Sequence, residues 1–235
     1  MPRGAKALQI LNDEIVACER CPELRVYCAE IARVRRRAYA DHEYWGKPVP
    51  SFGDPAASVM ALGLAPGAHG SNRTGRPFTG DGSGEFMFPV LHEAGFASQP
   101  NSTSRTDGMK LKGLWISAVV RCAPPANKPT PEEQRNCAPW LDREIELLPN
   151  LRVVVCLGRI AFDGLLNWAQ KSAGSEAMQP RARYVFAHSA EYVLPLGLTV
   201  IASYHPSLQN TNTGKLTRPM FLAVFRRARL VAGLR

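Results

Sequence analysis

The segment from residue 59 to residue 84, VMALGLAPGAHGSNRTGRPFTGDGSG, joins an apolar run to a loop that is nearly free of large side chains. The loop holds six glycines from Gly67 to Gly84, one phenylalanine (Phe78) and a single acid, Asp81. It lacks the Gly-Lys-Ser/Thr ending of a phosphate-binding P-loop and fits the dinucleotide fingerprint only loosely. Glycines let the backbone approach a flat ligand, and Phe78 offers a ring for stacking. The loop therefore predicts a site for a flat molecule beside one carboxylate.

The cysteines predict a metal centre. Four of the six supply a Cys-x-x-Cys pair and two distant single thiols: Cys18, Cys21, Cys122 and Cys137. Such a set can bind one centre, and zinc and an iron–sulfur cluster fit four thiolates equally well by count. Cys28 follows Cys21 closely enough to compete as a ligand, whereas Cys156, inside VVVCLG, fits a small buried hydrophobe. The chain shows no export signal, which argues against a disulfide framework.

Four short apolar runs must position these residues: SVMALGLA (58–65), LWISAVV (114–120), RVVVCLG (152–158) and LTVIASY (198–204). Near-continuous apolar strands are typical of a parallel sheet that is covered on both faces. We therefore expect an α/β fold, a three-layer α/β/α sandwich with a central four-stranded parallel sheet. Ligands bind at the carboxyl ends of such strands. The glycine loop, RCAPPANKP and HPSLQNTNTGKLT each leave such an end, so the site should lie where they converge.

Helix signals occupy the segments between and around these runs. Thr130 as N-cap, Pro131 at the first position and Glu133 at the third predict a helix. Apolar residues at helical spacing fill residues 4–38, with a boundary at Pro22, and an amphipathic helix ends the chain. The sequence contains no internal repeat or linker, so we expect residues 1–235 to form a single domain.

The charge of the chain predicts a polyanionic partner. Its net charge is +9, RVRRR at 33–37 is one basic cluster, and no Asp or Glu follows Glu191. Nucleic acid is the first candidate, and a solvated cationic surface is the alternative. No stretch reaches the roughly 18 apolar residues of a membrane span, and no signal-peptide hydrophobic region is present. We expect a cytoplasmic monomer, associated with the bacterial or archaeal nucleoid.

Several long segments together resemble one known family. GLAPGAHGSNRTGRPFTGDGSG, RCAPPANKP, HPSLQNTNTGKLT, YWGKPVPSFGDP and the four cysteines are similar in order and spacing to the family 5 (type b) uracil-DNA glycosylases. The resemblance covers most of residues 18–222 and implies a uracil-DNA glycosylase-like α/β/α fold and a [4Fe–4S] cluster. It also implies hydrolysis of the N-glycosidic bond of uracil in single- and double-stranded DNA, with hypoxanthine and xanthine as further substrates. Family 4 members carry polar groups where this chain has Leu64, Ala65 and Ala118. These departures from family 4 fit family 5.

The resemblance also implies roles for individual residues. Phe78 stacks on a base flipped from the duplex, and His205 donates a hydrogen bond to uracil O2 as charge grows. Asp81 activates or orients water, its alternative role being the N-cap of a helix that begins near Gly82. Asn127 joins these two as a candidate catalytic residue. The remaining substrate-binding candidates are Gly63, Ala65, Pro66, Gly67, His69 and Asn210.

The loop after His205 is implied to enter the minor groove and fill the gap left by the flipped base. The candidates for contact with DNA are Arg73, Arg76, Ser207, Leu208 and Lys215. The cluster is expected to be structural and to hold Asn127 in place. A non-catalytic or redox iron–sulfur protein that binds nucleic acid is the alternative, which explains the charge and cysteines but leaves the glycine loop without a role.

Overall fold

The structure, a computed structural model, describes residues 3–234. Its centre is a six-stranded sheet in the order β1-β3-β2-β4-β6-β5. The strands are β1 (Phe52–Gly53), β2 (Val59–Gly63), β3 (Leu114–Ala118), β4 (Val153–Leu157), β5 (Glu191–Val193) and β6 (Thr199–Ser203). The four inner strands are parallel, as predicted, while β1 and β5 are antiparallel edges. The edges are only two and three residues long and carry no strong apolar signal.

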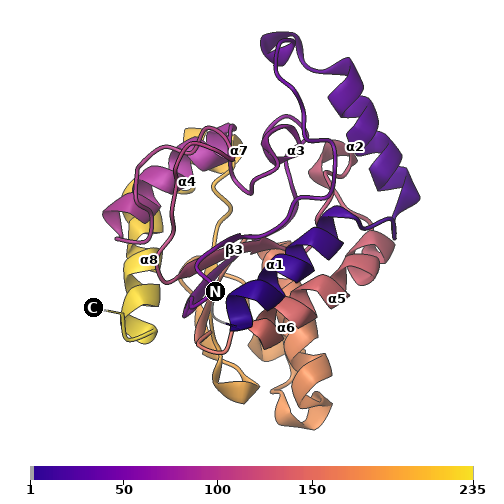
Figure 1. Cartoon of the computed structure of the whole chain (residues 1–235). Coiled ribbons are helices and arrows are strands. Elements are labelled where there is room, and N and C mark those ends of the chain that lie inside the picture. The colour runs from indigo at the N-terminus through magenta and orange to yellow at the C-terminus, as the bar shows by residue number, and fades with distance from the viewer. Residues whose placement is uncertain (1–2, 235) are drawn as a thin grey trace.

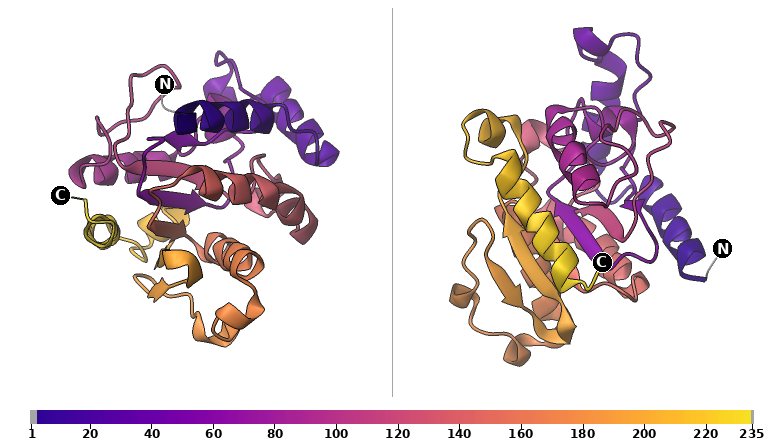
Figure 2. Two further views of the ribbon diagram at one scale, coloured as in Figure 1. Left: turned by 60° about the horizontal axis from the view of Figure 1, so that its bottom comes forward. Right: turned by 90° about the vertical axis from the view of Figure 1, so that its left-hand side faces the viewer.

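Helices cover both faces of the sheet (Figure 1), as the three-layer prediction requires. They are α1 (Arg3–Val16), α2 (Pro22–Val34), α3 (Ser71–Thr74), α4 (Gly82–Glu93), α5 (Pro131–Leu147), α6 (Arg159–Ala173), α7 (Leu208–Asn212) and α8 (Arg218–Val231). Short 3₁₀ turns are η1 (Arg37–Tyr39), η2 (Pro125–Asn127), η3 (Ser175–Ala177), η4 (Arg181–Arg183) and η5 (Pro195–Gly197). Helices α4 and α8 lie together on one face and α1, α5 and α6 on the other (Figure 2). None of the helices in residues 3–234 is long and apolar enough to cross a membrane.

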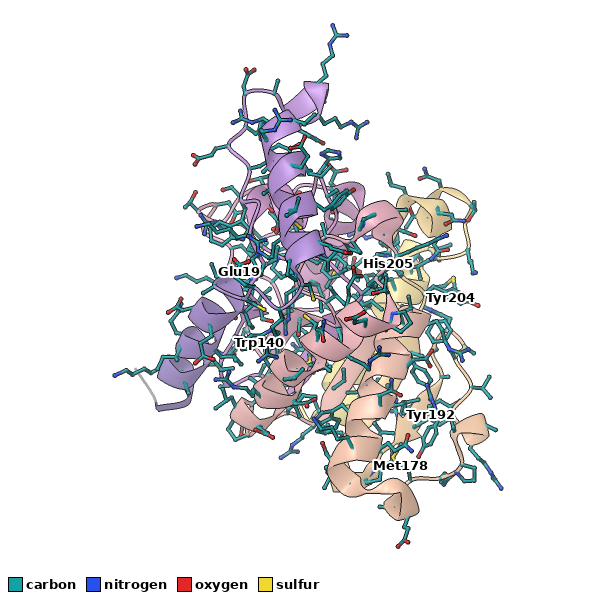
Figure 3. All side chains as sticks on the ribbon, turned by 90° about the vertical axis from the view of Figure 1, so that its right-hand side faces the viewer. Glu19, Trp140, Met178, Tyr192, Tyr204 and His205 are labelled. Atoms are coloured by element: carbon teal, nitrogen blue, oxygen red, sulfur yellow. The ribbon has the colours of Figure 1, made fainter. Side chains whose placement is uncertain are left out.

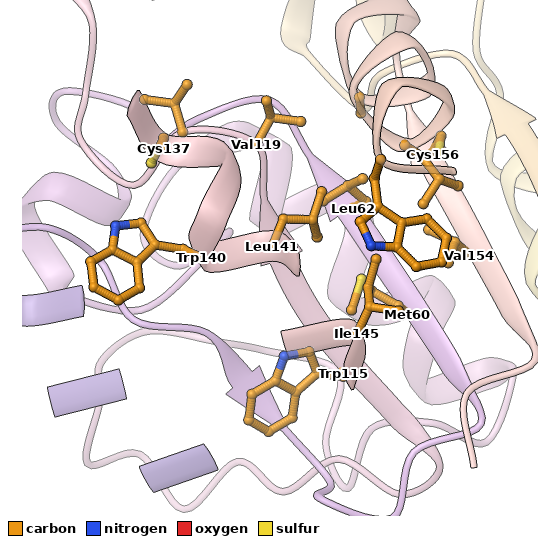
Figure 4. Packing of buried hydrophobic residues seen from close by; sticks show 14 of the residues in the cluster. Met60, Leu62, Trp115, Val119, Cys137, Trp140, Leu141, Ile145, Val154 and Cys156 are labelled. Atoms are coloured by element: carbon orange, nitrogen blue, oxygen red, sulfur yellow. The ribbon is translucent and has the colours of Figure 1, made fainter. Parts of the chain in front are cut away.

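The alternation of side chains along the strands builds the two apolar layers. In β2, Met60 and Leu62 enter the layer of α1, α5 and α6, while Val59 and Ala61 enter the layer of α4 and α8. All five residues of β2 are buried, which explains why the run is apolar throughout. Cys156 is fully buried among the first set of residues (Figure 4), as the VVVCLG pattern predicts.

The helix ends follow the local signals in the sequence. The Thr130 hydroxyl accepts the Glu133 N–H at 3.1 Å, and the Glu133 carboxylate accepts the Thr130 N–H at 2.7 Å. This capping box fixes the start of α5, the helix that carries Cys137. Pro22 opens α2, so the Cys-x-x-Cys segment lies in the connection between α1 and α2.

Candidate active site

Asp81 occupies the junction between the glycine loop and α4. One carboxylate oxygen accepts the Gly84 N–H at 3.0 Å, so Asp81 is the N-cap of α4. The other oxygen faces the start of the same loop. A Cβ added to Gly67 would lie 3.1 Å from this Oδ2, and one added to Gly70 would lie 2.6 Å from Asp81 Cγ. The cap therefore holds the carboxylate in a fixed place against the loop that follows β2.

The glycines have a packing role in addition to the expected close approach to a flat ligand. Several are approached closely by side chains of the protein itself, and Gly84 is approached by the Phe78 carbonyl. A Cβ on Gly63 would lie 2.9 Å from Phe78 Cζ, and one on Gly82 would lie 2.6 Å from Leu208 Cδ2. Gly75 is similarly covered by Trp45. The missing side chains at these glycines therefore leave room for Phe78, Leu208 and Trp45.

Phe78 and His205 bring two loops of the site together. Their ring centroids are 5.9 Å apart with 33° between the planes, and Phe78 is half-buried at φ 51°. A positive φ is unusual for an aromatic residue, and such strain persists only where the surroundings hold it. His205 lies two residues after the end of β6, next to Tyr204 (Figure 3), and a Cβ on Gly158, just after β4, would lie 3.5 Å from its Cβ. The carboxyl ends of the inner strands thus converge as predicted.

The environment of His205 sets its protonation state. Burial lowers the pKa of His205 to about 4, so the imidazole is neutral at neutral pH. Its backbone carbonyl accepts the side-chain amide of Asn210 at 2.8 Å. Asn210 was expected to contact base or water, whereas here it fixes the backbone that carries the imidazole. A neutral His205 can donate one ring N–H without adding a positive charge to the site.

The carboxyl group of Asp81 is shifted toward the range useful for a general base. Burial raises the pKa of Asp81, and the charge of Glu85 adds to this effect. The N–H groups of Gly84 and Ser83 lower the pKa, but burial is the larger cause. A carboxylate with a raised pKa binds a proton more readily than a solvated one, as a residue that activates water requires.

Comparisons of the sequence with known proteins identify its family. The sequence model of the uracil DNA glycosylase superfamily matches residues 50–229. The chain belongs to this superfamily. It is 52% identical to the Type-5 uracil-DNA glycosylase of Thermus thermophilus over 94% of this chain and 96% of that one. It is 44% identical to that of Pyrobaculum aerophilum (94% and 92%) and 43% identical to that of Mycobacterium tuberculosis (98% and 84%).

Two arginines of this glycosylase that were expected to contact DNA are buried instead. Arg73 is 7% exposed, and its guanidinium donates to the carbonyls of His69 (2.8 Å) and Gly80 (2.5 Å). Arg76 is 4% exposed and forms an ion pair with Asp107 at 2.5 Å. Their hydrogen-bonding groups are engaged within the protein, so we correct their role from phosphate contact to support of the glycine loop.

The loop after His205 presents the other expected DNA contacts at the surface. Ser207 is the N-cap residue of α7, and Leu208 is 56% exposed on that helix. Lys215 is exposed, with its ammonium 4.9 Å from the ring centroid of Tyr204. Leu208 also packs against Gly82, beside the Asp81 cap. An exposed leucine next to the site has the position needed to fill a gap in a base stack.

Asn127 lies in the turn after β3, and its contacts are local. It is exposed in η2, where Ala126 and Asn127 both have positive φ, and its N–H donates to the Pro124 carbonyl at 3.1 Å. Among the described residues, no hydrogen bond joins it to Phe78 or His205. The structure therefore brings Phe78 and His205 into contact and places Asp81 against the glycines of the same loop, while Asn127 stays a prediction.

Two supporting interactions of the site were not predicted from the sequence. His188 accepts the Tyr204 N–H at 3.3 Å and stacks on its ring at 5.2 Å, next to His205. The Tyr44 hydroxyl hydrogen-bonds His69 Nδ1 at 3.1 Å. Tyr44 lies in the YWGKPV segment, whose aromatic pair was a signal that could have found it, whereas His188 stands in a segment without such a signal.

The remaining substrate-binding candidates lie at the end of β2 and in the connection that follows it. Gly63 ends β2, and Ala65, Pro66 and His69 follow it in the connection to α3. Ala65 packs against the apolar layer, and the Leu64 carbonyl accepts the Val120 N–H at 2.9 Å. The backbone of this stretch is therefore tied to the segment between β3 and Cys122.

The four cysteines of the predicted metal centre line one cavity. Cys18, Cys21, Cys122 and Cys137 surround it with Arg20, Arg25, Leu24, Pro48, Val120, Arg121 and Asn136. The Arg121 N–H donates to Cys137 Sγ at 3.3 Å. Cys28 is fully buried next to Cys122, whose thiol it hydrogen-bonds, and it donates to the Ala123 carbonyl at 3.5 Å; it is not among the residues that line the cavity. Within residues 3–234, no three His, Cys, Asp or Glu side chains are poised around a single ion.

Proposed function

We propose that this protein hydrolyses the N-glycosidic bond of uracil in DNA and leaves an abasic site. The observation that carries the proposal is the meeting of Phe78 and His205 at the rim, with the Asp81 carboxylate held against Gly67 and Gly70 of the loop that carries Phe78. A duplex hides its bases, so an enzyme acting on one must flip the nucleotide into a pocket. The pocket then needs a stacking surface, a donor for charge on the base and a group that positions water. These three residues supply one each.

The chemistry assigned to the residues is as follows. Phe78 stacks on the flipped base, and the bond between the sugar C1′ and the base nitrogen breaks with its electron pair leaving on the base. The neutral imidazole of His205 donates to uracil O2, where negative charge develops. Asp81 orients a water and accepts its proton as the water oxygen bonds to C1′. The departing base anion then takes up a proton from solvent.

A product assay tests this function. We expect the purified protein to convert a uracil-containing duplex to a product that alkali cleaves at the former uracil, since hydrolysis leaves an abasic site. A matched duplex with thymine at that position is the control. DNA that is bound but stays uncleaved after alkali would instead support the alternative, a non-catalytic iron–sulfur protein that binds nucleic acid.

We also propose that the site accepts other deaminated bases, hypoxanthine and xanthine among them. The candidates for reading base edges are replaced by apolar residues at Leu64, Ala65 and Ala118. A pocket rejects a wrong base strongly when that base leaves polar groups of the pocket without hydrogen-bond partners. A pocket without matched polar side chains therefore discriminates only weakly among bases. In the same assay we expect single-turnover rates on hypoxanthine and xanthine duplexes within about 10- to 200-fold of the uracil rate, the span of weak apolar discrimination. A larger gap would contradict broad specificity.

A [4Fe–4S] cluster held by Cys18, Cys21, Cys122 and Cys137 is the cofactor we propose. Four thiols that line one cavity provide the ligand set for either zinc or an iron–sulfur cluster by count, and the resemblance of the sequence to family 5 favours the cluster. The N–H of Arg121 is suited to stabilise a ligating thiolate at Cys137. When bound, the cluster would link the connection before α2 to the loop after β3.

Metal analysis and single variants test this cofactor. We expect brown protein with near four iron and four sulfide per chain, as the formula of the cluster requires. Cys137→Ser should lose the colour because a ligand is removed, whereas Cys28→Ser should keep it, since Cys28 does not line the cavity. Both variants replace a buried thiol by a hydroxyl, which makes them matched. Colourless protein that contains one zinc per chain would contradict the proposal.

A further inference from the structure

The burial of Arg73 and Arg76 leaves open which cations of this chain meet the DNA. One basic segment stands apart: residues 33–44, which leave the end of α2, form η1 and return to Tyr44. We call it the arginine arm. It extends past the rest of the molecule on the side where α3 and α7 lie (Figures 1 and 2). That side is the carboxyl-end rim, from which DNA must approach the site.

Arg36 and Arg37 differ from the other two arginines of the arm in how their guanidinium groups are engaged. Arg33 is paired with Glu30 at 2.7 Å, and Arg35 donates to the Ala40 carbonyl at 2.7 Å. Arg36 and Arg37 are exposed. Throughout the described part of the chain, no acid forms an ion pair with either, the exposed Asp41 and Glu43 of the arm included.

The arm is anchored to the active-site loop by the buried Arg73. The Arg73 guanidinium lies 4.0 Å from the ring centroid of Tyr39 and 2.9 Å from His42 Nδ1. At the other end, the Arg36 N–H donates to the Tyr44 hydroxyl at 3.4 Å, and that hydroxyl reaches His69 Nδ1 at 3.1 Å. These interactions hold the arm in a fixed position relative to the loop that carries Asp81.

The positive charge of the arm reaches the site. Burial, Arg36 and Arg73 each lower the pKa of His69, in that order. His69 lies two residues after Gly67 in this loop, so Arg36 is close enough for its charge to act on the loop after β2.

We infer that Arg36 and Arg37 bind the phosphates of the DNA strand that flanks the flipped nucleotide. The inference rests on the proposed function and names the surface that meets the DNA. Exposed arginines without a carboxylate partner, beside a flipping site, provide charge for the backbone without reading sequence. Arg73 takes part as the anchor of the arm.

The test is the salt dependence of binding to a duplex without uracil, which isolates phosphate binding from chemistry. The variant is Arg36→Ala/Arg37→Ala. The matched control is Arg226→Ala/Arg227→Ala, which removes the same charge from α8, where Glu93 and Glu191 already neutralise these arginines. We expect the slope of log affinity against log salt to become shallower by about 0.9 for each phosphate that is no longer neutralised, and by roughly 1.8 in the arm variant.

Equal slopes for the arm variant and the control variant would overturn the inference. Arg36→Lys/Arg37→Lys keeps the charge and should keep the parental slope, and a change as large as that of the alanine variant would also overturn a phosphate role. The abasic-site assay on the parent protein separates the two proposals. If uracil is cleaved while the slopes are equal, the arm inference alone fails; if no uracil is cleaved, the proposed function fails whatever the slopes.

Discussion

Asp81→Asn is expected to lower the single-turnover rate of uracil excision by about 10²- to 10⁴-fold, the usual contribution of a general base. Asparagine keeps the size of the side chain and an oxygen that can accept the Gly84 N–H, and it is as good an N-cap as aspartate. The substitution thus removes the charge and leaves the start of α4 intact. Rates measured with enzyme in excess over uracil duplex report this step directly.

The stability of the same variant separates a cap from a base. Burial disfavours the ionised form of Asp81 and raises its pKa, so at neutral pH the folded state bears the penalty of a desolvated charge. Asp81→Asn should therefore unfold at the parental temperature or slightly above it, while DNA binding is retained. A variant that cleaves uracil at the parental rate would show that Asp81 is only a cap.

The pH profile gives an independent check on Asp81. The parental rate should fall on acidification as Asp81 takes up a proton, at a pH above the ordinary 3.8 of an aspartate because its pKa is raised. The residual activity of Asp81→Asn should lack this fall. Gly70→Ala offers a second route, since its Cβ would displace the carboxylate without removing the charge. It should reduce the rate as well.

His205→Ala is expected to lower the single-turnover rate on uracil by about 10²- to 10³-fold, the reduction that follows removal of one donor aimed at developing charge. The reduction should be smallest for bases that already leave easily, because these need the least stabilisation of the anion. Asn210→Ala is a useful companion, since it frees the His205 carbonyl but keeps the imidazole. Its effect should be smaller than that of His205→Ala.

The stability of His205→Gln tests the neutral state of the imidazole. The pKa of His205 in the folded protein is about 4, below the ordinary 6.5, so the unfolded chain binds more protons between these values. His205 therefore makes the parent lose stability as the pH falls from about 6.5 to 4. The variant should lose less over this interval, as measured by denaturant unfolding. An equal loss would show that the imidazole is not neutral through burial.

The sequence by itself determined the sheet and the identity of the loops around it. Buried parallel strands are apolar throughout, so four runs were enough to predict the inner strands and the rim at their carboxyl ends. The capping box at Thr130 and Glu133 is local, and so it could be read directly. The composition of the glycine loop is likewise a local feature, so Phe78 and Asp81 could be predicted as site residues from the sequence.

Only the tertiary structure decided what each side chain in that loop touches. Asp81 is both a cap and a residue facing Gly67 and Gly70, and the glycines make room for neighbouring side chains. Nothing in the sequence distinguishes Arg73 and Arg76 from exposed arginines. The fold buries both, and Arg76 pairs with Asp107, which is distant in the chain. Burial and ion pairing depend on which segments meet in space, and spacing along a chain does not encode that.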